Sequence, residues 1–113
     1  MHTTKFARDH NGASIGIAHW KWGSRRELPI DTASNRLATP LVEHLVLIAP
    51  TTACHVRLGA ADVLANDTDP VLQPGTVYQF PRASGETHVA LVAKNGAGTG
   101  TAEVWEADTF NEE

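Results

Sequence analysis

The sequence is poor in cysteine, in long apolar runs and in helical periodicity, and each shortage excludes a class of protein. A single cysteine, Cys54, rules out a disulfide within the chain and suits folding in a reducing cytoplasm. The longest apolar runs, such as LVLIA at 45–49, are far shorter than the roughly 20 residues of a membrane-spanning helix. The first residues, MHTTKFARDHNG, lack the apolar segment of a secretion signal. We therefore expect no membrane association and no secretion.

Basic residues are scarce in the second half of the chain. Residues 1–60 hold seven Lys or Arg against four Asp or Glu, a net +3, whereas residues 61–113 hold two against nine, a net −7. An acidic half of this kind argues against a general nucleic-acid-binding protein. The split either reflects uneven placing of charges in a short chain or helps a basic arm of one copy dock on an acidic neighbour.

Helical periodicity is weak, and alternation of apolar and polar residues is strong. The best helical segment, AADVLAND at 60–67, has room for one turn or a loop. Prolines fall at the ends of the alternating segments, where they disturb a strand least. Strands are expected over 13–22, 41–49, 54–59, 76–80, 87–93 and 101–107. Short strands joined by Gly-, Pro- and Asp-rich turns predict an all-β protein, a small jelly-roll-like β-sandwich.

The chain is expected to form one domain with an extended N-terminal arm. Residues 23–40, GSRRELPIDTASNRLATP, are polar and offer few apolar anchors, so they are interpreted as an arm or a long loop. This places the arm at 1–40 with one strand-like segment, the sandwich at 41–108 and a loose tail at 109–113.

The glycine-rich stretch NGAGTG at 95–100 raises the question of a phosphate-binding loop. Such a loop needs a helix directly behind its glycines, and the following residues, TAEVWEAD, alternate with a period of two instead. Asn-Gly is a favoured turn pair. The stretch is therefore predicted to be a turn joining two strands of a hairpin.

No catalytic or metal-binding constellation is evident, so we expect neither an enzyme nor a cofactor. The six histidines include no H-x-H pair, and Glu86 near His88 is more typical of a surface contact than of a metal site. Cys54 and His55 are adjacent, so a strand turns them to opposite faces, and Cys54 is interpreted as a buried thiol. A remote alternative is a cupin-like metal enzyme, and its ligands would come from His44, His55 and His88.

The most distinctive surface-type cluster is HWKWGSRR at 19–26. On a strand its two tryptophans share one face. They either pack on their own sandwich, anchor the arm on a neighbouring subunit, or provide a stacking site for a sugar or a single-stranded nucleic acid. The candidate residues of a subunit or capsid interface are Trp20, Lys21, Trp22, Arg25 and Arg26.

From residue 41 onward three stretches resemble small phage-encoded virion proteins. LVEHLVLIAPTTACHVRLGA is similar to their opening pair of strands, the second of which ends in V-x-L-G. PVLQPGTVYQFPR is similar to their next element, in which an L-x-P-G turn leads a strand. THVALVAKNGAGTGTAEVWEA resembles their last hairpin.

Proteins of this type are head decoration (cement) proteins, fibre parts or other virion components on small β-sandwiches. The resemblance implies a non-enzymatic structural protein, assembled in the host cytoplasm into the virion, where it bridges subunits of the major capsid protein. It also implies homo-oligomers, with a trimer on local threefold axes as the decoration-protein arrangement. The alternative is a fibre or carbohydrate-binding module that uses the tryptophans as a sugar platform.

Overall fold

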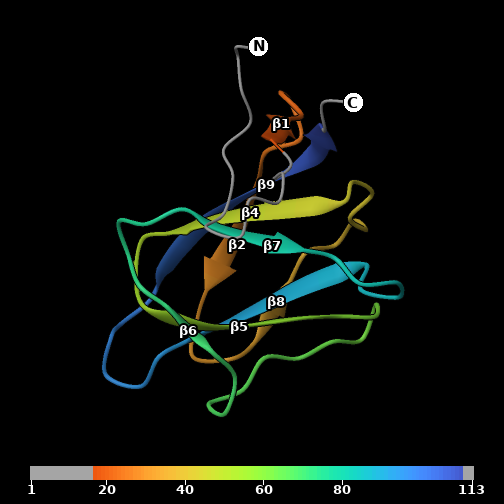
Figure 1. Cartoon of the computed structure of the whole chain (residues 1–113). Helices are drawn as coiled ribbons and strands as arrows, with labels where there is room; N and C mark the ends of the chain where they lie inside the picture. Colours follow the sequence, from red (N-terminus) through yellow and green to blue (C-terminus); the bar gives the residue numbers. More distant parts are fainter. Residues whose placement is uncertain (1–16, 111–113) are drawn as a thin grey trace, which may run out of the picture.

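The computed structural model describes residues 17–110 as an all-β protein of two antiparallel sheets packed face to face (Figure 1). The first sheet holds β1 (Ile17–Trp20), β2 (Arg26–Ile30), β4 (Leu45–Pro50), β7 (Tyr78–Pro81) and β9 (Gly100–Phe110). The second sheet holds β3 (Asn35–Arg36), β5 (Cys54–Gly59), β6 (Val71–Leu72) and β8 (His88–Ala93). The predicted small β-sandwich is thereby confirmed. These residues include no helix, and hence none with the length and hydropathy of a membrane span.

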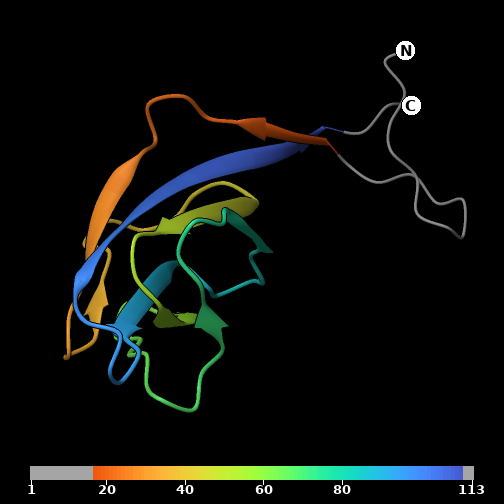
Figure 2. The ribbon, with the colours of Figure 1, turned by 90° about the vertical axis from the view of Figure 1, so that its left-hand side faces the viewer.

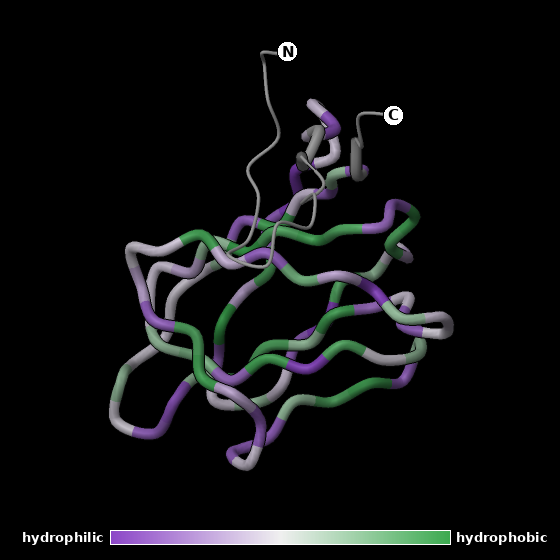
Figure 3. The backbone as a smooth tube through the Cα atoms, in the orientation of Figure 1, coloured by the Kyte–Doolittle hydropathy of each residue, from purple (hydrophilic) through white to green (hydrophobic). Residues whose placement is uncertain are grey.

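The core lies between the sheets and follows from alternation along the strands. On β5 the side chains of Cys54 and Val56 point inward, while Arg57 points outward and is exposed. In Figure 3 apolar residues gather along the strands of both sheets. Thirteen buried residues form this core, among them Val46, Ile48, Val89, Leu91 and Val104. Burial raises the pKa of the Cys54 thiol to about 11, because the thiolate would lose its hydration. The thiol is buried, as predicted.

The prediction that 23–40 lies outside the sandwich is wrong. Strand β2 pairs with β9, and β3 pairs with β8. Leu28 and Ile30 are 2 % and 0 % exposed, and Leu37 joins them in the core. Proline at position 29 and charged neighbours conceal a strand that has only two inward-facing side chains. The sandwich therefore begins at about residue 26, and the part of the arm before residue 17 lies outside the described residues.

The stretch 95–100 forms the predicted turn but not the predicted hairpin. The amide of Ala97 donates to the Lys94 carbonyl at 2.9 Å, and Gly96 has φ 84°, which defines a turn around Asn95-Gly96. The turn leads from β8 in the second sheet to β9 in the first. Six of the eight connections between consecutive strands cross between the sheets in this way, so neighbours in sequence seldom pair. The strand β9 that follows excludes the helix of a phosphate loop.

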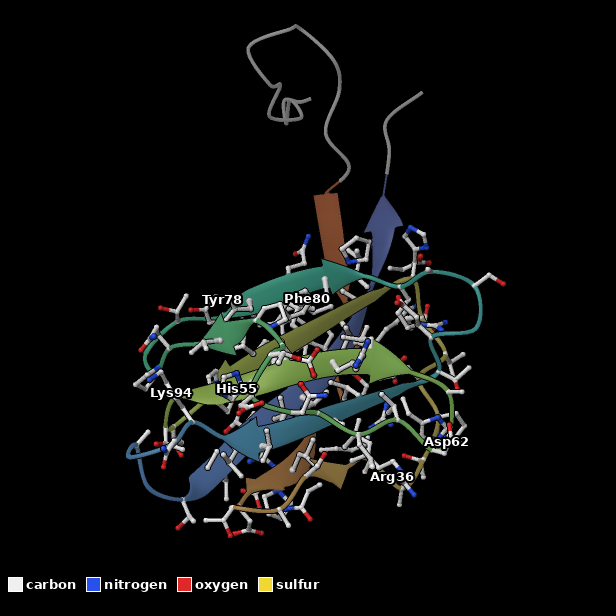
Figure 4. The ribbon with its side chains drawn as sticks, turned by 90° about the horizontal axis from the view of Figure 1, so that it is seen from below. Arg36, His55, Asp62, Tyr78, Phe80 and Lys94 are labelled. Carbon is white, nitrogen blue, oxygen red and sulfur yellow. The ribbon has the colours of Figure 1, made fainter. Side chains whose placement is uncertain are left out.

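The loop 60–70 covers the outer face of the second sheet. Val63 and Ala65 are buried there against Ala90 and Val92. Side chains in the second sheet and just before it hold the loop through its backbone: the hydroxyl of Ser34, which precedes β3, accepts a hydrogen bond from the Ala65 amide at 2.9 Å. Further bonds join Arg36 to the Val63 carbonyl at 3.3 Å and His55 Nδ1 to the Asp69 carbonyl at 2.8 Å (Figure 4). No helical turn forms in this segment, which is a loop throughout.

Candidate functional site

Strand β9 pairs with two strands, β1 and β2, along the same edge, and the site lies at the junction between them. Its C-terminal part pairs with β1, with Trp20 opposite Ala107. Its N-terminal part pairs with β2, with Arg26 opposite Val104. Residues 21–25 therefore face only positions 105 and 106 of β9 and must loop out. In Figure 2 this loop stands at the base of the two-stranded ribbon that β1 and the end of β9 extend beyond the sandwich.

A tight turn fixes the shape of this loop. The Ser24 amide donates to the Lys21 carbonyl at 3.1 Å, and Gly23 has φ 93°, the left-handed conformation that a type II turn requires at its third residue. Trp22 thus occupies the tip. The Ser24 hydroxyl donates to the Lys21 carbonyl at 2.6 Å and accepts from the Glu106 amide at 3.0 Å, which ties the turn to β9.

All three tryptophans of the chain meet at this turn. The ring centroids of Trp20 and Trp22 are 5.6 Å apart at 53°, and those of Trp20 and Trp105 are 5.0 Å apart at 61°. Such tilted, edge-on arrangements are favourable for aromatic pairs. Trp105 packs against Leu45, Leu47 and Ala107 on the outer face of the first sheet. Trp22 is 81 % exposed, which is unusual for the largest apolar side chain.

Charged side chains border the rings. Glu27 and Glu103 are directly opposite across β2 and β9, where like charges repel. Arg25 Nη2 offsets this repulsion by binding Glu27 Oε2 at 3.1 Å and Glu103 Oε2 at 3.2 Å. The hydrogen bond to Glu103 and, to a smaller extent, the one to Glu27 raise the pKa of Arg25. Within the described part of the chain, the Lys21 ammonium takes part in no ion pair.

We call this surface the tryptophan patch. It encloses a shallow hollow of about 250 Å³. The indole nitrogen Nε1 of Trp105 is buried and has no hydrogen-bond partner among the residues that the structure describes. The patch consists of Trp20, Lys21, Trp22, Arg25, Glu103 and Trp105.

Arg26 does not belong to the patch, although the sequence groups it there. Its guanidinium instead forms an ion pair with Glu106, whose side chain is 4 % exposed. Oε1 of Glu106 accepts hydrogen bonds from the amides of Val42 at 2.6 Å and Glu43 at 2.7 Å. Glu106 therefore joins the start of β2, the segment before β4 and β9 at one buried point. Arg26 has a structural role in this network.

The structure brings together four of the five sequence-predicted interface residues and adds two. Trp20, Lys21, Trp22 and Arg25 line one hollow. Sequence reasoning misses Trp105 and Glu103, which lie more than 75 residues away and reach the patch through the pairing of β9 with β1 and β2. The only local signal is the alternation of 101–107, which places Trp105 on the face opposite Ala102 and Val104.

The histidines of the cupin-like alternative do not converge. His55 and His88 are buried, and each Nδ1 has a hydrogen-bond partner: the Asp69 carbonyl for His55 and the Thr87 hydroxyl at 2.8 Å for His88. His44 is exposed ahead of β4. Among the described residues no three His, Cys, Asp or Glu side chains gather in a way that could hold a metal ion. His2, His10 and the His19 side chain lie outside the described part.

Comparison with known proteins adds no identity to this architecture. No protein-family model matches the chain, and no match is found among curated proteins or among solved structures.

Proposed function

We propose that the chain is a non-enzymatic structural protein of a phage virion, a capsid decoration protein that binds neighbouring protein subunits through its tryptophan patch. The observation that carries the proposal is the exposure of Trp22 on a turn that its own hydrogen bonds hold in place. Trp and Arg are the side chains that dominate the binding energy of protein interfaces. A rigid aromatic side chain that is already positioned loses little conformational freedom when it is buried by a partner.

The edges of the first sheet support binding through a face. The Arg82 amide donates to the His44 carbonyl. Because the backbone groups of successive residues in an antiparallel strand point to opposite sides, those of Phe80 and Tyr78 also face β4, and those of Gln79 and Pro81 face away from it. Likewise, the Thr51 amide donates to the Thr101 carbonyl, so Thr101 and Glu103 direct their backbone groups toward β4. Their partners on β2, Pro29 and Glu27, therefore direct theirs outward. Proline has no amide hydrogen, so the β7 edge and the β2 part of the opposite edge each lack a donor that an added strand would need. Along β7 and β2 a partner is therefore expected to use side-chain surfaces rather than strand addition.

The virion location rests on the resemblance of residues 41–107 to small virion proteins. A small sandwich with one compact binding patch suits a protein that acts in many copies. Each copy on a capsid would bind weakly, and an oligomer would add these contacts by avidity. Partners in this proposal are further copies of the chain and the major capsid protein.

The proposal is tested on purified virions and on capsids assembled without this chain. We expect quantitative mass spectrometry to find the chain as a multicopy virion component, and the purified protein to bind the bare capsids. Trp22→Ala should abolish most of this binding, whereas Val77→Ala, which removes a 51 % exposed apolar side chain elsewhere, should not. Absence of the chain from virions would refute the proposal. Its presence in tails alone, together with glycan binding lost in Trp22→Ala, would favour the fibre or carbohydrate-binding alternative.

A further inference from the structure

We infer that the tryptophan patch is a self-association surface, on which a second copy of this chain docks about a twofold axis. The inference names the partner of the patch used in the proposed function. It depends on that use of the patch and not on the place of the protein in a virion.

The shape of the patch is self-complementary. Trp22 projects from the turn and is 81 % exposed, and the hollow of about 250 Å³ lies beside it on the same surface. A twofold contact joins the same surface of two copies, so a projection beside a hollow can fill the hollow of the partner in both directions. The two-stranded ribbon of β1 and β9 also gains from such a contact, since a two-stranded ribbon is marginal in water without packing.

The charges of the patch complement themselves as well. The surface carries the cations Lys21 and Arg25 and the anion Glu103, with Glu27 next to it. Lys21 has no ion-pair partner in its own described chain, whereas Glu103, whose side chain is 52 % exposed, is still accessible beside Arg25. A second copy brings Glu103 toward Lys21 twice over. A strongly acidic or basic partner would instead place like charges against part of this surface.

The hollow is small for other occupants. Small-molecule pockets commonly enclose about 300–1,000 Å³, so about 250 Å³ suits one large side chain better than an oligosaccharide. Arg25 and Glu103, the groups that would bind sugar hydroxyls, already bind each other. These features favour a protein side chain, and Trp22 is the side chain that the patch itself supplies.

The chain carries its own reporter for this contact. Because all three tryptophans meet at the patch, the intrinsic tryptophan fluorescence reports only on this surface. We expect a dilution series from about 1 mM to about 1 µM, a range of weak to moderate affinities, to show a dimer by sedimentation. Its formation should shift the tryptophan emission to shorter wavelength as water leaves the rings. Trp22→Ala should weaken the dimer about 30-fold or more, the effect of a hot-spot residue, and Val77→Ala should leave it unchanged.

Charge reversal tests the twofold geometry. Lys21→Glu alone and Glu103→Lys alone should each weaken the homodimer, because each places two like-charged pairs in the contact. We expect the fold to tolerate Glu103→Lys, because the new ammonium lies directly opposite Glu27 on β2 and the ion pair with Arg25 that is lost is exposed. Mixed one to one, the two variants should form a heterodimer in which both cross pairs are opposite in sign. A head-to-tail trimer of the same variants always keeps one like-charged pair, so only an even assembly is fully rescued.

Three outcomes would overturn the inference: a monomer at every concentration, an assembly that forms without a change in tryptophan emission, or a trimer that mixing does not rescue. A monomer that still binds capsids through Trp22 would refute self-association and leave the proposed function standing. A patch-dependent dimer that is absent from virions would support self-association and refute the proposed function.

Discussion

The two outer faces of the sandwich both carry apolar side chains, but only one face is covered by a loop of the chain. Each sheet carries apolar side chains that point away from the core: Ala90 and Val92 on the second sheet, and Leu45, Leu47 and Trp105 on the first. The second sheet is covered by loop 60–70 of its own chain, which is held through its backbone by side chains of the sheet and of Ser34 just before it. The first sheet ends in the tryptophan patch, where Trp22 is left exposed although the turn beneath it is well bonded.

This difference separates packing for stability from packing for recognition. A covering loop completes the fold within one chain, and its buried residues contribute to stability. An exposed aromatic side chain on a fixed turn contributes little to the isolated chain and gains its apolar burial only when a partner arrives. Substitutions on the two faces should therefore have opposite signatures, in stability on one side and in association on the other.

The largest effect is expected where the exposed face is attached to the fold. Glu106→Ala removes the partner of Arg26 and the acceptor of the Val42 and Glu43 amides, so buried polar groups lose their bonds. We expect the free energy of unfolding in urea to fall by about 3 kcal/mol, the lower end of the range for a broken buried ion pair, because Arg26 keeps some contact with water.

Glu103→Ala is the matched control for this prediction. It removes the same residue type from the same strand, but the Glu103 side chain is 52 % exposed and, among the described residues, is paired with Arg25 alone. The cost should stay below about 1 kcal/mol. Equal losses for the two variants would contradict the role assigned to Glu106.

The sequence predicts most of the covered core but little of the patch, and the reason is the range of the contacts. Alternation along 54–59 and the apolar run at 87–93 identify β5 and β8 correctly, because each signal can be read within one strand. Strand β2 escapes detection because it has only two core residues, and the residue between them is Pro29, which cannot donate a hydrogen bond within a sheet and so argues against a strand. The hairpin expected at 95–100 fails because strand pairing across two sheets cannot be read from neighbours in sequence.

The patch is accordingly half predicted. The pair Trp20 and Trp22 stands out in the sequence as two large aromatic residues among charged ones. Trp105 and Glu103 join them only through strand pairing. Between Trp20, opposite Ala107, and Arg26, opposite Val104, the chain uses three more residues than β9 does, and these extra residues form the turn that carries Trp22. That Arg26 lies outside the patch could not be predicted for the same reason, since its buried partner Glu106 is 80 residues away.

An intermediate effect is expected on the covered face. Val63 is 8 % exposed and packs with Ala65, Ala90 and Val92, so Val63→Ala should lower the free energy of unfolding by about 1.5 kcal/mol. The neighbouring Leu64 is 59 % exposed, and Leu64→Ala should change it by less than about 0.5 kcal/mol. Neither variant should alter the tryptophan emission of the native protein. A change in that emission would show that the two faces are coupled and would undermine the contrast drawn between them.

The smallest effect on stability is expected from the residue with the largest expected effect on association. Trp22→Ala should change the free energy of unfolding by about 0.5 kcal/mol or less, because Trp22 is 81 % exposed and its described ring contact is with Trp20 alone. Trp105→Ala should cost several times more, about 3 kcal/mol, because Trp105 packs against Leu45, Leu47 and Ala107. The test is denaturant unfolding of the two variants at a concentration where both are monomeric. It distinguishes Trp105, which stabilises the fold, from Trp22, which is available to a partner. If Trp22→Ala proved as costly as Trp105→Ala in the monomer, Trp22 would be part of the fold, and the first sheet would be closed by its own chain as the second one is.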